Sequence, residues 1–114
     1  MLTELEITEK MEQHRDLILG ILAEEQADIC PEYLAYREDE EPGILVTFAV
    51  DDDPEYLAYQ TGDTSFSGGC YQYSHWASVA VYADSDLHSL ADDVVETLID
   101  EVVCALEEID EIDN

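Results

Sequence analysis

The last third of the chain holds the feature that most constrains its fold, a long apolar stripe at helical spacing. Its members recur three or four residues apart: Leu87, Leu90, Val94, Leu98, Val102, Leu106 and Ile109. Ser85 or Asp86 is suited to cap the start of this helix, and Ser89 with Asp92 forms a second capping pair. Such a helix gains most of its stability when another layer covers its apolar face. We therefore predict a C-terminal helix that packs against the rest of the chain.

Residues 3–25 predict a second amphipathic helix at the other end of the chain. Thr3 and Glu6 have the spacing of a capping box. Apolar residues then follow at helical intervals: Ile7, Met11, Leu17, Ile18, Ile21 and Leu22. We expect this helix to end before Pro31, because proline disfavours helical backbone in the residue that precedes it.

Four β-like segments lie between these helices, at 32–38, 43–50, 54–61 and 75–83. The second of them, GILVTFAV, is nearly all apolar, so we expect it at the centre of a sheet. The order of elements predicts an α+β fold with two layers. In this fold a four-stranded antiparallel meander is flanked by N- and C-terminal helices (α-β-β-β-β-α), and residues 1–114 form a single domain.

The hexapeptide PEYLAY occurs twice, at Pro31–Tyr36 and at Pro54–Tyr59. Six identical residues are too few to establish a duplicated repeat unit. Two interpretations stay open. The copies are either two similar edge strands or two equivalent Glu/Tyr surfaces that contact a partner together.

The charge balance is extreme, with 30 Asp and Glu against 3 Lys and Arg and a formal net charge of −27. A hydrophobic fraction of 46% excludes a disordered acidic tail. Solubility requires a net charge of only about 2–8 in a small domain, and further charge opposes folding by self-repulsion. Function or a saline environment therefore maintains the excess. Its sign excludes nucleic acid and anionic membranes as direct partners and favours a basic protein surface.

The candidate partner-binding residues are carboxylates on the predicted last helix and in two turns: Asp93, Glu96, Asp100, Glu107, Glu111, Asp51, Asp52, Asp53, Glu38, Glu40 and Glu41. Helical steps of four residues rise by about 6 Å, which is comparable with the spacing of phosphates along a nucleic-acid strand. A solvated helix face is the alternative interpretation of this pattern. Tyr71, Tyr73 and Trp76 are candidate aromatic anchors beside the charged rim, and a place on the sheet face is their alternative.

Catalytic and metal-binding patterns are weak in this chain. Asp51–Asp53 lacks the glycine and bidentate glutamate of an EF-hand loop. Cys70, His75 and His88 lack paired zinc-ligand spacing, and the acidic surroundings disfavour a reactive Cys70 thiolate beside His75. We therefore predict a protein that is not an enzyme, with no metal and no cofactor.

Targeting signals are also absent from the sequence pattern. Residues 1–22 carry acids throughout, and no apolar run approaches the ~20 residues of a membrane span. Three cysteines fit a reduced compartment better than a disulfide framework. We expect a cytoplasmic protein (in the host cytoplasm if a phage encodes it) that is a monomer or homodimer and does not bind membranes.

In length, charge and carboxylate-bearing helices the chain resembles small acidic DNA-mimic inhibitors of phages and mobile elements, such as anti-restriction and anti-CRISPR proteins. The resemblance covers size and composition and includes no sequence motif. It implies an inhibitor that occludes the basic groove of a DNA-binding or host-defence protein. Small acidic chaperones of secreted effectors have similar length and charge, and an acidic structural or assembly protein is a further alternative.

Overall fold

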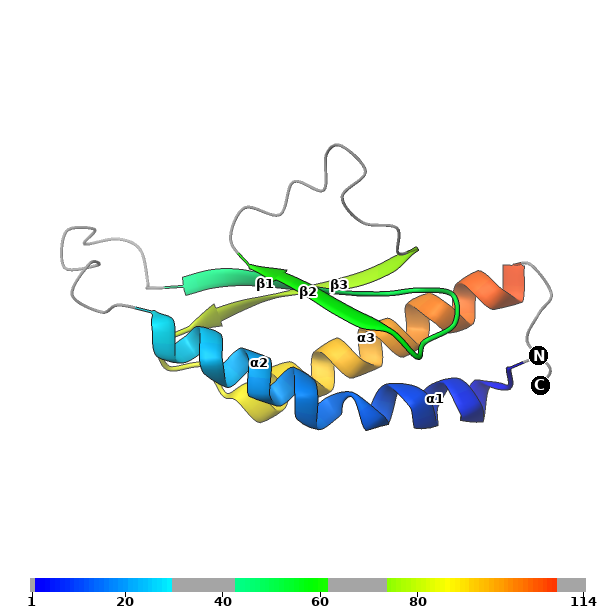
Figure 1. Ribbon diagram of the computed structural model, residues 1–114, viewed down its shortest axis with the longest axis horizontal. Coiled ribbons are helices and arrows are strands. Elements are labelled where there is room, and N and C mark those ends of the chain that lie inside the picture. The colour runs from blue at the N-terminus through cyan, green and yellow to red at the C-terminus, as the bar shows by residue number, and fades with distance from the viewer. Residues whose placement is uncertain (1, 30–42, 62–73, 109–114) are drawn as a thin grey trace.

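Figure 1 shows a computed structural model, which describes residues 2–29, 43–61 and 74–108 of the chain. These ranges form helices α1 (Glu4–Gln13) and α2 (Arg15–Asp28), strands β1 (Gly43–Val50), β2 (Leu57–Thr61) and β3 (His75–Tyr82), and helix α3 (Leu87–Glu108). The fold is α+β, and the helices lie on one face of an antiparallel sheet (Figure 1).

The sheet of the described residues has three strands in the order β2-β1-β3. The predicted four-stranded meander is therefore wrong, because β3 pairs with β1 and not with the strand that precedes it in sequence. β1 is nearly all apolar and needs a neighbour on each side, and all eight residues of β3 pair with it, from Gly43↔Tyr82 to Val50↔His75. The central position expected for 43–50 is confirmed, whereas segment 32–38 lies outside the described residues.

β2 is shorter than the predicted strand 54–61, because the turn after β1 extends through its first residues. The Glu55 N–H donates to the carbonyl of Asp53 at 2.8 Å, and Pro54 is buried in this turn. Pairing with β1 starts only at Leu57, opposite Val50. The second PEYLAY copy is thus half turn and half strand, and the first copy lies outside the described ranges.

Alternation along the strands gives the sheet two chemically different faces. Val46, Phe48 and Val50 of β1 join Ala77 and Val81 of β3 in the hydrophobic core beneath the helices. The opposite face, here called the outer sheet face, consists of uncharged residues: Leu45, Thr47, Ala49, Ala58, Gln60, Trp76, Ser78, Ala80 and Tyr82. No carboxylate stands on this face among the described strands.

The N-terminal segment forms two helices where the apolar spacing predicts one. The helices meet at His14, whose N–H donates to Met11 at 3.0 Å, a tighter turn than the α-helical one. The ring Nε2 of His14 lies 3.3 Å from the carbonyl oxygen of Pro54. A tertiary contact with the β1–β2 turn thus accompanies the break, and apolar spacing carries no sign of it. Thr3 caps α1 as predicted, since its hydroxyl accepts the Glu6 N–H at 3.1 Å.

α3 starts at Leu87, as its capping residues predict. Asp86 accepts hydrogen bonds from the Ser89 hydroxyl at 3.0 Å and from the His88 N–H at 3.1 Å. The bond from Ser89 is the main cause that lowers the pKa of Asp86. The predicted stripe through Leu106 is buried or half-buried, and Ile109 lies outside the described ranges. Across the described residues, no helix has the length and apolar character needed to span a membrane.

Candidate partner-binding surface

Four of the predicted acidic residues form a row along α3. This α3 stripe, which is Asp93, Glu96, Asp100 and Glu107, is exposed, and its residues follow one another at steps of three, four and seven. Buried residues such as Val94 and Leu98 occupy the opposite side of the helix. No ion pair within the described part of the chain involves these four carboxylates. Their charge therefore faces solvent without compensation there.

Exposed Cys104 separates Asp100 from Glu107 in this row, as the sequence indicates. The remaining predicted acids Glu38, Glu40, Glu41 and Glu111 lie outside the described residues.

The second group of carboxylates is the acidic turn, which comprises Asp51, Asp52, Asp53 and Glu55. All four are exposed, although the turn itself is held from two sides. Asp52 Oδ1 lies 2.7 Å from Nε2 of the buried His75 at the start of β3. Lys10 of α1 contacts Asp53 at 3.8 Å and donates a hydrogen bond to Glu55. These contacts tie Asp52 to β3, and Asp53 and Glu55 to α1.

Lys10 and Glu55 alter each other's protonation. The hydrogen bond to Glu55 raises the pKa of Lys10 above its ordinary value of 10.5. The hydrogen bond from Lys10 lowers the pKa of Glu55 below 4.5. Both side chains therefore stay charged over a wider pH range than usual.

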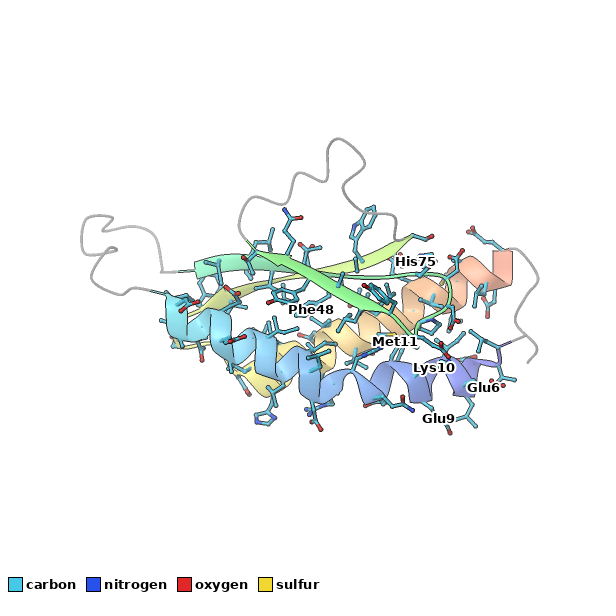
Figure 2. The ribbon with its side chains drawn as sticks, in the orientation of Figure 1. Glu6, Glu9, Lys10, Met11, Phe48 and His75 are labelled. Carbon is cyan, nitrogen blue, oxygen red and sulfur yellow. The ribbon has the colours of Figure 1, made fainter. Side chains whose placement is uncertain are left out.

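A hollow of about 440 Å³ joins the acidic turn to the helices. Its lining residues come from the N-terminal residues with α1, from the turn and from the C-terminal end of α3: Leu2, Glu6, Lys10, Asp52, Asp53, Glu55 and Leu106. Figure 2 shows Lys10 extending from α1 toward the turn, with Glu9 pointing away from the sheet. Glu107 of the α3 stripe follows Leu106 directly. The acidic turn therefore lies near the C-terminal end of α3, at the buried Leu106, while Glu107 lies about 100° further around the helix and does not line the hollow.

A smaller groove of about 260 Å³ lies between α1 and α3. Buried Val95 and half-buried Ile99 line it with three carboxylates, Glu12, Asp92 and Glu96. Arg15, the first residue of α2, donates through Nε to Asp92 at 2.7 Å. This hydrogen bond is the main cause that raises the pKa of Arg15, and Asp16 and Glu12 add to it.

Of the three aromatic candidates, Trp76 lies within the described residues. Trp76 is 47% exposed, but it belongs to the outer sheet face, on the other side of the sheet from the helices. Tyr71 and Tyr73 lie outside the described residues. Trp76 therefore belongs to a different surface from the α3 stripe.

The weak metal and nucleophile patterns gain no support from the described geometry. His75 faces Asp52 at the turn, and His88 lies at the start of α3. Within residues 2–29, 43–61 and 74–108, no cluster of three His, Cys, Asp or Glu side chains is arranged to hold a metal ion. Cys70 lies outside these ranges.

Sequence reasoning missed the contacts that position the surface. Lys10 meets Glu55 across 45 residues and Arg15 meets Asp92 across 77, separations that no local pattern encodes. The sequence does contain one indication, because each of the three Lys and Arg residues among 30 Asp and Glu is expected to pair with a carboxylate. That signal marks Lys10 and Arg15 as anchors without naming their partners.

Comparison of the chain with protein-family models, with curated proteins and with solved structures gives no match.

Proposed function

We propose that this protein is an acidic inhibitor that mimics the charge of nucleic acid and occludes the basic groove of a DNA-binding or host-defence protein. The observation that carries the proposal is the exposed α3 stripe, which has no compensating cation in the described part of the chain. The acidic turn extends the same sign of charge toward the end of the helix.

The fixed positions of the carboxylates support this function physically. A carboxylate on a helix, or one tied to Lys10 or His75, loses little freedom when a partner's lysine or arginine approaches. A one-signed array also steers a basic partner and accelerates association at low ionic strength. Both effects favour competition with DNA for a groove that evolved to bind phosphates.

Competition is the test of this function. The tagged protein is used to capture a basic partner, and binding of that partner to labelled duplex DNA is then measured with increasing inhibitor. We expect mutually exclusive binding, with an inhibition constant that rises several-fold between about 50 and about 300 mM NaCl. A ternary complex with DNA, or inhibition that does not weaken with salt, would contradict the proposal.

A second candidate function is that of a small acidic chaperone for a secreted protein. The observation that favours it is the outer sheet face, where Trp76 and Tyr82 are exposed and no described residue is charged. A client segment would contact this face through apolar side chains, and its binding would change little with salt. The inhibitor proposal places the contact on the helices instead.

A further inference from the structure

We propose that the groove between α1 and α3 seats an arginine of the partner that is flanked by apolar residues. The inference rests on the proposed function, because it takes the partner's surface as basic. It adds the place on this protein where the partner binds and the kind of side chain that binds there. The occupant is a segment in which arginines alternate with apolar side chains.

The volume and lining of the groove match a single arginine side chain. Its volume of about 260 Å³ lies below the roughly 300–1,000 Å³ of pockets for small molecules, and it is a size that suits one long side chain. Val95 and Ile99 form an apolar floor, and the carboxylates of Glu12, Asp92 and Glu96 surround it. An arginine side chain matches this lining, because its carbon stem covers apolar surface while its guanidinium reaches charged groups.

The chain itself supplies a precedent for this chemistry. Arg15 already pairs with Asp92 at the groove, and its guanidinium is 2.7 Å from the carboxylate oxygen. One internal cation leaves two of the three lining carboxylates in excess, since no ion pair within the described residues involves Glu12 or Glu96. The groove therefore retains negative charge for a second guanidinium.

The position of the groove links it to the rest of the acidic surface. Glu96 belongs both to the groove lining and to the α3 stripe, so a segment seated here also passes Asp93 and Asp100. A purely electrostatic surface would accept any polycation equally well. The apolar floor instead predicts a preference between polycations of equal charge.

The test uses two synthetic amidated peptides of equal length and equal arginine content. One has leucines between the arginines and the other has serines in their place. Binding to the full chain is measured by calorimetry at about 50 and about 300 mM NaCl. We expect the leucine peptide to bind roughly fivefold or more tightly, with the preference kept at the higher salt because the apolar contribution is not screened.

Matched variants locate the binding. Glu12→Gln with Glu96→Gln is compared with Glu101→Gln and Glu108→Gln, which remove the same charge from exposed positions that do not line the groove. Glu101 lies about 140° around α3 from Glu96. We expect the groove pair to weaken the leucine peptide roughly three- to tenfold and the control pair less than about twofold.

The apolar floor has its own control. Ile99→Thr should lower affinity for the leucine peptide but not for the serine peptide, whereas Val103→Thr, one helical turn further on, should affect neither. Thermal melts verify that both variants fold. Equal affinity for the two peptides, or equal weakening by both glutamine pairs, would contradict the proposed arginine site in the groove. Neither result would contradict the proposed inhibitor function. Failure of both peptides to bind at about 50 mM NaCl would count against the proposed function itself.

Discussion

The helix layer and the outer sheet face differ sharply in charge. On the outer sheet face the β3 residues, from Trp76 to Tyr82, are exposed, whereas Thr47 and Ala49 of β1 are fully buried. α1 and α3 present carboxylates to solvent at Glu9, Glu12, Asp93 and Asp100, whereas the outer sheet face has no described charge. A charge needed only for solubility or for a saline medium would be useful on every exposed surface. Among the described residues the carboxylates stand on the helices and in the turns, which favours a surface that meets one kind of partner.

The largest expected effect tests what holds these two surfaces together. Phe48 is fully buried between the sheet and the helices. Phe48→Ala should lower the free energy of unfolding by roughly 3–5 kcal/mol, because it removes apolar burial and leaves a cavity. Urea denaturation measures the loss. Ala80→Ser on the exposed outer sheet face is the control, with an expected change within about 0.5 kcal/mol. Similar losses for both would contradict the assignment of the core.

Neutralising the α3 stripe should raise the stability of the protein, and this tests whether the carboxylates of the helix layer repel one another. The stripe variant carries four substitutions: Asp93→Asn, Glu96→Gln, Asp100→Asn and Glu107→Gln. At about 20 mM NaCl we expect its melting temperature to exceed that of the parent by roughly 3 °C, because like charges at helical spacing repel. The parent's melting temperature should rise with NaCl up to about 300 mM and the variant's should rise less. A parent melting temperature that does not respond to salt would contradict the clustered charge.

A smaller, pH-dependent effect concerns the pinned acidic turn. The pKa of Glu55 is lowered in the folded chain by Lys10, so the stability from this pair is present above the ordinary pKa of 4.5 and is lost as pH falls through the lowered value. Lys10→Met should therefore destabilise the protein modestly at pH 7 and hardly at all near pH 3. Chemical denaturation of both proteins at the two pH values checks this. A difference in the free energy of unfolding between parent and variant that is larger at pH 3 than at pH 7 would contradict this prediction.

The smallest expected effect separates the inhibitor from the chaperone candidate. Trp76→Ala alters the outer sheet face and leaves every helix carboxylate in place. For an inhibitor that binds through its helices, affinity for a basic partner should stay within about twofold of the parent value. A loss of tenfold or more, measured by calorimetry, would move the contact to the outer sheet face and favour the chaperone.

Local patterns in the sequence predicted the helices better than the sheet. Capping at Thr3 and Asp86 depends on neighbours three residues away, so the starts of α1 and α3 can be read directly. Strand order depends on pairings between distant segments. β3 pairs with β1, although β2 and the residues that follow it separate the two strands in the sequence. No turn signal in the sequence indicates this pairing. The four-stranded meander failed for this reason.

The candidate surface divides in the same way. Exposure of Asp93, Glu96, Asp100 and Glu107 followed from the helical period, because Val94 and Leu98 had to face the core. The approach of the acidic turn to the end of α3 could not be predicted, since it depends on long-range contacts of Lys10 and His75. The groove between α1 and α3 could not be predicted from the sequence either, because the residues of its two sides are far apart in the chain.

The central claim is that the α3 stripe contacts the partner, and one comparison of affinities tests it most directly. The stripe variant is set against a control with the same net charge, altered at exposed acids elsewhere: Glu4→Gln, Asp16→Asn, Glu24→Gln and Asp28→Asn. Affinity for the captured basic partner is measured for both at about 50 mM NaCl. We predict a loss of roughly tenfold or more for the stripe variant and of less than about threefold for the control. Equal losses would show that only net charge matters and would contradict the claim.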